Sequence, residues 1–269
     1  MTKIALFGLG EAGGLIGKDL ASGTHSSDQT LQLVGYDPAN VNTPDGFERA
    51  QRASEAVADA DYILSFTGSI DAKTALEQAI DTIPPSAVYA DFASASAGLK
   101  RDLATTANHA GFKFCDVALM AMVPGNGIKT PAMLSGNGAQ ALHKLLSGFG
   151  MPVDIVSTTA GDAAERKLLR SVVIKGLAAL LIEALEGAHK ANSQDWLWQN
   201  LVGEFTRMDK KMLQRLVEGT EIHADRRFHE MVASAQQLNE LGVEPLMTNS
   251  TVSNLDKVKR NGVPDVPKI

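Results

Sequence analysis

The sequence predicts an α/β domain built on a parallel sheet, followed by an all-α domain. Short apolar runs alternate with helix-like stretches over residues 1–156, which is the pattern of strands joined by crossover helices. After this point no strand-like run follows, and apolar residues recur at helical spacing instead. We place the boundary near residues 157–161, so that one domain covers residues 1–158 and the other covers residues 159–269.

Seven segments of the first domain have the length and apolar character of buried strands. They are Lys3–Phe7, Leu31–Tyr36, Tyr62–Phe66, Val88–Asp91, Lys113–Ala118, Ala132–Ser135 and Val153–Val156. Helix-like stretches that end at Gly, Pro or a polar turn lie between them. They are near Gly10–Ala21, Ser54–Asp59, Ala72–Ile80, Gly98–Ala110 and Ala139–Gly148.

The second domain is predicted to begin with a long apolar helix over Asp162–Asn192. At about 1.5 Å per residue this helix would exceed 40 Å in length. The remainder predicts three or four further helices, around Asp195–Val217, Thr220–Leu241 and Thr248–Asn261. A small helical domain cannot readily cover so long an apolar helix, so we expect a homodimer.

Composition excludes several classes of protein. The chain has 269 residues, of which 44% are hydrophobic and 21% charged, so it is neither disordered nor a coiled coil throughout. An excess of 31 acidic over 25 basic side chains disfavours nucleic acid and anionic membranes as partners. The single cysteine, Cys115, cannot form an intrachain disulfide. Because neither a signal peptide nor a membrane-spanning run is recognisable, we expect a soluble, cytoplasmic protein.

A glycine-rich turn follows the first strand and opens the first helix. Its residues have the spacing G-x-G-x-x-G and are Gly8, Leu9, Gly10, Glu11, Ala12 and Gly13. In such a unit the first glycine permits the tight turn, the second admits a pyrophosphate and the third permits close helix packing. The pattern predicts a dinucleotide-binding Rossmann domain, against the alternative of an ordinary glycine-rich turn. We expect Phe66 and Thr67, at the end of a neighbouring strand, to contact the cofactor as well.

The second strand runs directly into Asp37, whose carboxylate is placed to accept both ribose hydroxyls of an adenosine. The same carboxylate would repel a 2′-phosphate. Its neighbours Tyr36, Pro38 and Ala39 carry no cation that could neutralise one. The sequence therefore favours NAD over NADP, unless Asp37 is an ordinary strand-end aspartate.

Four segments give the chain a resemblance to the 3-hydroxyacid dehydrogenase superfamily, which includes 3-hydroxyisobutyrate and 6-phosphogluconate dehydrogenases. They are the glycine turn, Asp91–Ser96, Asp116–Val123 with Met133–Gly136, and Gly161–Ser171. The stretches Lys167–Ser171 and Lys175–Glu183 are most similar to a branch whose C-terminal domain resembles a phosphogluconate dehydrogenase domain of unknown function. The resemblance covers nearly the whole chain. It implies an NAD-dependent oxidoreductase whose helical domain binds substrate and forms a dimer.

The resemblance implies that Lys167 is the general acid/base at the reacting hydroxyl. A lysine that is partly desolvated beside a nicotinamide can accept a proton from an alcohol as hydride leaves the same carbon. Arg170, Ser171 and Lys175 follow on the same helix face, where we expect them to contact substrate. Ser171 departs from the family, which usually has an asparagine there. Without the family, these residues also fit a solvated charged stripe on an amphipathic helix.

Two further segments bear on the substrate. Ser94 falls where the family places a hydroxyl or amide that touches substrate and nicotinamide, although it could instead cap the helix beginning near Gly98. The family's Ser-Gly-Gly substrate loop is here Met120, Ala121 and Met122. Unless these methionines belong to the core, they predict a bulkier, less polar pocket. The substrate is then expected to be larger and less polar than 3-hydroxyisobutyrate.

A charged cluster occurs in the C-terminal domain, and its residues His229 and Glu230 fall where many relatives carry Lys-Asp near the active site. Its members are His223, Arg226, Arg227, His229 and Glu230. We expect Arg226 and His229 to contact substrate, against the alternative of a solvated helix face. The two histidines are six residues apart and do not share a helix face, so no metal site is expected. The chain also lacks a Gly-x-Ser-x-Gly elbow, which argues against serine hydrolysis.

These observations predict an NAD-dependent oxidoreductase that moves hydride between the cofactor and an alcohol β to a carboxylate or similar group. An imine reductase shares the expected architecture, but those relatives usually lack the helix lysine. A non-catalytic dinucleotide-binding redox sensor is the rival from another class, and the retained Lys167 argues against it.

Overall fold

The computed structural model describes residues 1–23, 30–39 and 41–267. Contacts divide the chain into two units, Met1–Arg170 and Ser171–Ile269. The division falls inside the long helix α6 (Asp162–Lys190), whose first turns pack with the first unit. Among the described residues, none of the helices combines the length and the apolar character that a membrane crossing requires.

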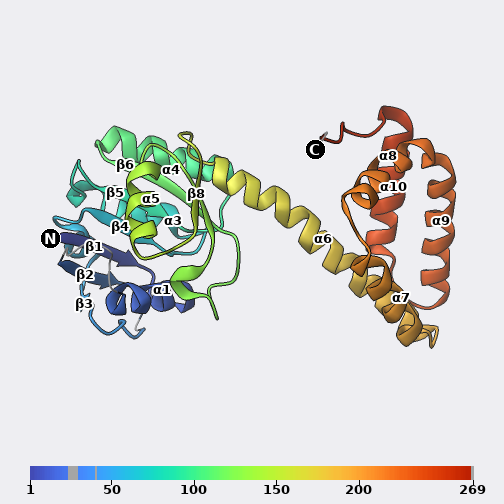
Figure 1. The fold of residues 1–269 in the computed structure, drawn as a ribbon, viewed down its shortest axis with the longest axis horizontal. Coiled ribbons are helices and arrows are strands. Elements are labelled where there is room, and N and C mark those ends of the chain that lie inside the picture. The colour runs from blue at the N-terminus through green and yellow to red at the C-terminus, as the bar shows by residue number, and fades with distance from the viewer. Residues whose placement is uncertain (24–29, 40, 268–269) are drawn as a thin grey trace. The chain divides into compact units, whose positions relative to one another are not determined.

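A sheet of eight strands in the order β3-β2-β1-β4-β5-β6-β7-β8 forms the centre of the first unit (Figure 1). The strands are β1 (Thr2–Phe7), β2 (Leu31–Tyr36), β3 (Glu48–Arg49), β4 (Tyr62–Ser65), β5 (Val88–Asp91), β6 (Lys113–Leu119), β7 (Ala132–Ser135) and β8 (Val153–Ser157). All neighbouring pairs are parallel except β6 and β7. The predicted α/β class is therefore confirmed.

The central strands are buried on both faces, as a parallel sheet covered by helices requires, whereas the edge strands β3 and β8 are partly exposed. In β1, Ile4 and Leu6 belong to one buried cluster, whereas Ala5 and Phe7 belong to the other. Alternation of side chains along a strand sends them to opposite faces, so each strand contributes to two core layers. The helices of this unit are α1 (Glu11–Ser22), α2 (Ala53–Val57), α3 (Ala72–Glu77), α4 (Ala97–Ala110) and α5 (Ala139–Gly148).

The register of the sheet aligns the carboxyl ends of the central strands. Phe7 pairs with Tyr36 of β2 and with Ser65 of β4, while Asp91 of β5 pairs with Ser65 and with Asp116 of β6. The loops that follow these strands therefore emerge along one edge. In open parallel sheets this carboxyl edge is where ligands bind.

All seven predicted strands are present, with ends that differ by at most one residue. The short strand β3 escaped prediction because two residues carry no periodic signal. It pairs with β2 through Val34–Glu48 and Gly35–Arg49, so only its tertiary position defines it.

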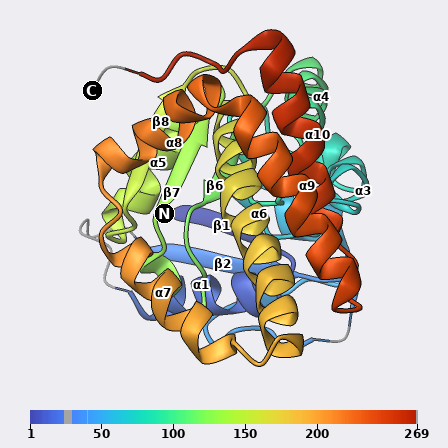
Figure 2. The same cartoon turned by 90° about the vertical axis from the view of Figure 1, so that its right-hand side faces the viewer.

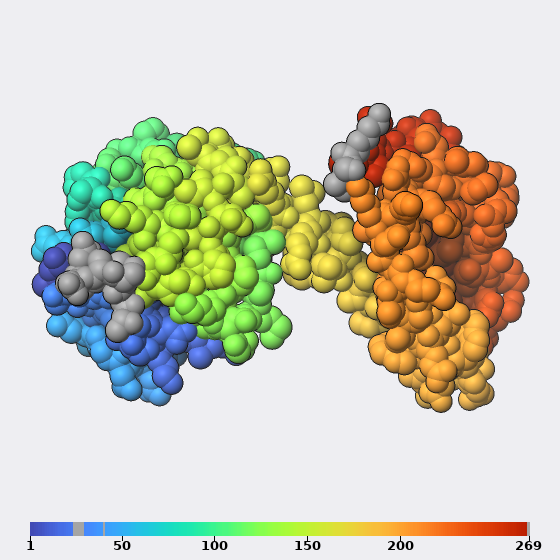
Figure 3. All heavy atoms as spheres, in the orientation of Figure 1, coloured from blue at the N-terminus to red at the C-terminus, as the bar shows by residue number. Residues whose placement is uncertain are grey.

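The second unit is helical, and its last two helices pack side by side (Figure 2). Its helices after α6 are α7 (Gln194–Thr206), α8 (Lys210–Ile222), α9 (Ala224–Glu240) and α10 (Leu246–Asn261), whose atoms are coloured orange to red in Figure 3. The predicted helix Asp195–Val217 is wrong as a single element. The carboxylate of Asp209 accepts a hydrogen bond of 2.8 Å from the Met212 amide and starts α8 there. Thr220, predicted to begin a helix, lies inside α8.

A buried carboxylate, Glu183 of α6, caps the N-terminus of α10. Its two oxygens accept hydrogen bonds from the Met247 amide at 2.6 Å and from the amide and hydroxyl of Thr248 at 2.9 and 2.6 Å. Burial opposes ionisation, but these donors outweigh it and lower the pKa of Glu183. The ionised form is therefore favoured by folding.

We expect Glu183→Gln to destabilise the second unit by about 1–3 kcal/mol at neutral pH, because an amide cannot accept all three hydrogen bonds. The folded-state pKa of Glu183 is lowered, so its contribution is present above the unfolded pKa and is lost as pH falls through the folded pKa. The difference in the free energy of unfolding between Glu183→Gln and the unmutated protein should therefore become smaller as the pH is lowered. Denaturant unfolding followed by tryptophan fluorescence measures it, since both tryptophans lie in α7. Glu186→Gln, at an exposed position one turn further along α6, is the control; an equal loss in both variants would contradict the capping role.

Candidate active site

The glycine turn between β1 and α1 leaves no room for a side chain at two of its glycines. Gly8 has φ +80°, and a Cβ added there would lie 2.8 Å from the Phe66 carbonyl oxygen. A Cβ at Gly13 would lie 1.9 Å from the Gly8 carbonyl oxygen, so helix and strand pack too closely for any side chain. A Cβ at Gly10 would meet no atom within 4 Å, which leaves open space at the start of α1. The three glycines thus have the three roles that a dinucleotide-binding turn requires.

Asp37 lies beside this turn, at the carboxyl end of β2. One carboxylate oxygen accepts a hydrogen bond of 2.7 Å from the Leu9 amide, and the other accepts one of 2.8 Å from the Ala39 amide. These bonds fix the carboxylate next to the glycine turn. Each oxygen retains a lone pair, so the ribose hydroxyls of an adenosine can still be accepted there.

Arg49 of β3 organises the loop that carries Asp37, and sequence reasoning missed it. One terminal nitrogen of its guanidinium donates to the Asp37 and Ala39 carbonyl oxygens at 2.6 and 3.0 Å. The other donates to the Val41 carbonyl oxygen and the Thr43 hydroxyl at 3.1 and 3.3 Å. A cation therefore does lie near Asp37, but its terminal donors are engaged with the loop. No sequence pattern indicates this role of Arg49, because β3 becomes a neighbour of β2 only in the folded sheet.

An open groove of about 530 Å³ runs beside the glycine turn. Leu9, Gly10 and Glu11 line one side of it, and residues 42–45 line the other. Next to the turn, Phe66 stacks on Phe92 with ring centroids 4.1 Å apart, and the Thr67 hydroxyl lies 3.2 Å from that of Ser65. The predicted cofactor residues of β1, β2 and β4 are thus gathered at one edge of the sheet.

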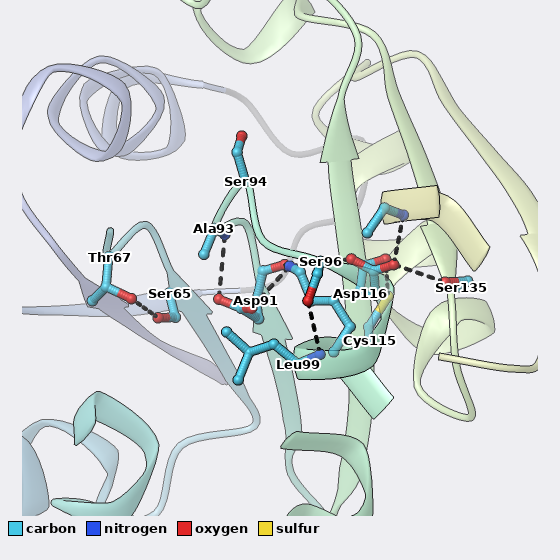
Figure 4. A network of polar contacts seen from close by, with 12 residues as sticks. Ser65, Thr67, Asp91, Ala93, Ser94, Ser96, Leu99, Cys115, Asp116 and Ser135 are labelled. Carbon is cyan, nitrogen blue, oxygen red and sulfur yellow. Dashed lines mark hydrogen bonds and ion pairs between the residues drawn. The ribbon is translucent and has the colours of Figure 1, made fainter. Parts of the chain in front are cut away.

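Lys167 and Ser94 meet at the next strand along this edge. The Lys167 ammonium, in the second turn of α6, donates a hydrogen bond of 2.9 Å to the Ser94 hydroxyl oxygen. Ser94 is not the cap of α4, because Ser96 fills that role and accepts a hydrogen bond of 3.2 Å from the Leu99 amide. Figure 4 shows the Ser94 side chain pointing away from the Asp91 carboxylate. Ala93, Ala95, Val117, Ala118, Ala164 and Leu168 line the small niche around the pair.

A buried network of charges lies on the same strands, and Figure 4 shows its two carboxylates, Asp91 and Asp116, with Ser94. The side chains of Asp91, Lys100 and Asp116 are all 0% exposed. The Lys100 ammonium lies 2.8 Å from Asp91 Oδ2, 3.1 Å from Asp116 Oδ1 and 2.8 Å from the Asp91 carbonyl oxygen. Burial raises the pKa of Asp91, and the Lys100 ammonium acts in the opposite direction. Sequence reasoning did not identify Lys100 as a buried residue, because a lone lysine on a helix is ordinarily solvated.

The predicted substrate loop lies at the end of β6. Met122 is 72% exposed and Met120 is half-buried, so Met122 does not belong to the core. Ala121 is exposed as well. None of these three residues lines the niche of Lys167, whose nearest members from this segment are Val117 and Ala118. Contact of the methionines with substrate stays a prediction.

The remaining predicted substrate residues belong to α6 and α9. Arg170 and Lys175 are exposed and Ser171 is half-buried. On α9, Arg226 pairs with Glu230 along the exposed helix face, and the His229 ring nitrogen lies 3.9 Å from an Asp225 carboxylate oxygen. Lys259 of α10 holds Asp225 at 2.6 Å, and together with His229 this ammonium lowers the pKa of the Asp225 carboxyl. Over the described ranges, no group of His, Cys, Asp and Glu side chains is arranged to hold a metal ion.

The fold is a Rossmann-type α/β unit with a glycine-rich turn after its first strand, joined to a helical unit. Residues 188–258 match a family described as a domain of unknown function, DUF1932. An uncharacterised 28.5 kDa protein of Methanothermus fervidus is 30% identical over 139 residues, which are 52% of this chain and 54% of that protein. The chain thus matches about half the length of this curated relative.

Two solved structures share the fold over nearly the whole chain. A conserved protein of unknown function, reported as structurally similar to 3-hydroxyacid dehydrogenases, has a TM-score of 0.60 at 23% identity and covers 96% of this chain and 97% of its own. An imine reductase variant from Myxococcus stipitatus in complex with NAD⁺ has a TM-score of 0.78 at 15% identity and covers 98% of this chain and 95% of its own. Both comparisons show that the chain shares its fold with these proteins, as the resemblance in sequence predicted.

Proposed function

We propose that the protein is an NAD-dependent oxidoreductase that transfers hydride between nicotinamide and an alcohol β to a carboxylate or similar group. The observation that carries this proposal is the 2.9 Å hydrogen bond between Lys167 and Ser94, at the edge of the sheet where the glycine turn lies. A dinucleotide fits the turn, because Gly10 leaves open space where Gly8 and Gly13 pack against backbone. Similarity in fold to an enzyme that holds NAD⁺ supports the same cofactor.

The chemistry assigns separate tasks to the two side chains. Bound NAD would supply the hydride acceptor, which takes two electrons and a hydrogen from the carbon that bears the hydroxyl. Lys167, as the free amine, takes the proton of that hydroxyl, and Ser94 holds the lysine nitrogen in place through its own oxygen. The oxidised product is a carbonyl compound, and the lysine leaves the step as an ammonium. In the reverse direction the same ammonium protonates the alkoxide.

An imine reductase is the second candidate, since an imine reductase shares the fold at a TM-score of 0.78. The retained Lys167 favours an alcohol, because a lysine amine is suited to accept a hydroxyl proton. A panel separates the candidates. Hydroxyacids and aryl-substituted hydroxy compounds are incubated with NAD, and carbonyl compounds and cyclic imines with NADH, while NADH absorbance is followed.

Turnover of a hydroxy compound supports the proposal, and turnover of imines alone would contradict it. NADH binding without turnover of any member would instead indicate a redox sensor. We expect aryl-substituted compounds to have the higher kcat/KM than 3-hydroxyisobutyrate, because Met120 and Met122 replace small polar residues in the loop. Met120→Ser should reduce that preference.

Asp37 is expected to make NAD bind at least about tenfold tighter than NADP. The physical reason is repulsion between the carboxylate and a 2′-phosphate, while the terminal donors of Arg49 are engaged by the loop. Titration calorimetry with both cofactors measures the ratio of their dissociation constants. Asp37→Ala should bring this ratio closer to one. Asp45→Ala is the control, since Asp45 lines the same groove on its opposite side. Equal affinity for the two cofactors in the unmutated protein would overturn the assignment.

A homodimer is expected because α6 presents apolar side chains in several directions. Val172, Val173 and Ile174 are 71%, 65% and 53% exposed, and successive helix residues point about 100° apart. A helix that is apolar on all sides is normally buried on all sides. Light scattering at micromolar concentration should give twice the mass of one chain. Val172→Glu should lower the measured mass toward that of one chain. Ile70→Glu, which changes an exposed apolar residue outside α6, should leave it unchanged. A monomeric mass for the unmutated protein would count against this expectation.

A further inference from the structure

The buried network of Asp91, Lys100 and Asp116 contains two carboxylates and one ammonium. With both carboxylates ionised it carries one excess negative charge in a place that water does not reach. Burying such a charge is costly unless hydrogen-bond donors surround it. The protein must therefore supply donors from another element.

The first turn of α6 supplies those donors. The Ala164 amide donates a hydrogen bond of 2.9 Å to Asp116 Oδ2, and the Ser135 hydroxyl donates one of 3.1 Å to the same oxygen. The Ser135 oxygen in turn accepts a hydrogen bond of 3.1 Å from the Ala163 amide. Amides at a helix N-terminus lack partners within the helix and carry a partial positive charge. The amides at the start of α6 thus stabilise the negative charge of the network, and the network supplies the acceptors that these amides lack within the helix.

The network holds a residue three positions before each member of the proposed reacting pair. Ala164, whose amide is fixed by Asp116, precedes Lys167 by three residues on α6. The two residues are therefore about one helical turn apart. Asp91 precedes Ser94 by three residues, and its carboxylate also accepts a hydrogen bond of 3.3 Å from the Ala93 amide. The backbone on both sides of the Lys167–Ser94 contact is therefore held by the same group of charges.

We propose that Asp116, bridged by Ser135 to the first turn of α6 and by Lys100 to Asp91, positions the Lys167 ammonium against the Ser94 hydroxyl. Asp116 and Ser135 are positioning residues, since they touch neither reacting atom and act through the helix start. The importance of this contact for turnover rests on the proposed function, but the placement of Lys167 does not. The two claims can therefore fail separately.

Ser135→Ala is the central variant, because it removes the hydroxyl that joins Asp116 to the Ala163 amide, and it leaves the direct Ala164–Asp116 hydrogen bond and both ion pairs of Lys100 intact. Two readouts on the protein alone report the placement. Hydrogen exchange measures the protection of the Ala163 and Ala164 amides, and competitive acetylation with peptide mass spectrometry measures the reactivity of the Lys167 amine against pH. We expect exchange at the Ala163 amide, which loses its acceptor, to rise about tenfold, and exchange at the Ala164 amide to rise less. We also expect Lys167 to acetylate several times faster, while exposed Lys73 on α3 stays unchanged.

Two further variants make the test specific. Ser135→Thr retains the hydroxyl, so the Ala163 amide should be protected, and Lys167 acetylated, as in the unmutated protein. Thr130→Val removes another buried hydroxyl, one that bonds the Gly127 carbonyl oxygen at 2.8 Å, and should change neither readout at α6. Asp116→Asn should raise both the amide exchange and the Lys167 acetylation more than Ser135→Ala does. If Asp116→Asn does not fold, the results for Ser135→Ala alone decide the test.

Faster exchange with unchanged Lys167 acetylation would overturn the proposal, since the network would then only stabilise the fold. Equal effects of Thr130→Val would overturn it as well. Once a substrate is identified by the panel, Ser135→Ala should lower kcat and leave the affinity for NADH unchanged. Altered acetylation without turnover of any substrate would uphold the positioning of Lys167 and contradict the proposed function.

Discussion

Lys167→Met is expected to lower kcat by about two to four orders of magnitude, which is the usual contribution of a general acid/base. Methionine is similar in length but can neither accept nor donate the proton. The affinity for NADH should stay unchanged, because the glycine turn lies between β1 and α1 and Asp37 follows β2, whereas Lys167 lies on α6. Steady-state kinetics with the best compound of the panel, together with NADH titration, measures both quantities.

Lys175→Met is the matched control, since it removes a second lysine two turns further along the same helix. It should act mainly on KM. If Lys175→Met were inactive and Lys167→Met nearly normal, the catalytic residue would be misplaced by two helical turns.

Lys100→Met should have the largest effect on stability. It removes the cation that lies 2.8 and 3.1 Å from two buried carboxylates, so that the first unit must either bury unpaired charge or bind protons. Loss of one partner from a buried ion pair costs about 3–5 kcal/mol. Urea unfolding followed by circular dichroism measures the loss, and Lys113→Met at the exposed start of β6 should cost little.

The pH dependence of Lys100→Met distinguishes charge from packing. Burial already raises the pKa of Asp91, and loss of the ammonium raises it further. A folded-state pKa above the unfolded value gives stability that is present at low pH and is lost as pH rises through the folded value. The deficit of the variant should therefore be smaller at about pH 5 than at pH 8. A deficit that does not change with pH would show that only packing was lost.

The parts of the site that the sequence could predict are those whose signal is local. Gly8, Gly10 and Gly13 lie within one turn, and Asp37 follows its strand directly, so spacing alone placed them. The α/β class was predictable because apolar runs and helical stretches alternate regularly. The expectation that Lys167 and Ser94 share a site depended on family resemblance, since 73 residues separate them.

Other parts depend on strand order, which local patterns do not specify. Arg49 reaches the Asp37 loop only because β3 pairs with β2 at the sheet edge. Asp116 and Ser135 face each other only because β7 runs antiparallel to β6, with this pair in register. The break between α7 and α8 was missed because Asp209 acts as a helix cap inside a segment that is otherwise helical in pattern.

Transfer of deuterium from NADH that carries deuterium at both C4 positions tests the proposed function most directly. The labelled cofactor is incubated with the carbonyl members of the panel, using the unmutated protein and Lys167→Met, and the products are examined by mass spectrometry. Hydride transfer predicts deuterium on the carbon that becomes the alcohol, formed at least about a hundredfold more slowly by Lys167→Met. Label that stays on the nicotinamide with every carbonyl compound, or enters product at equal rates with both proteins, would contradict an oxidoreductase in which Lys167 moves the proton.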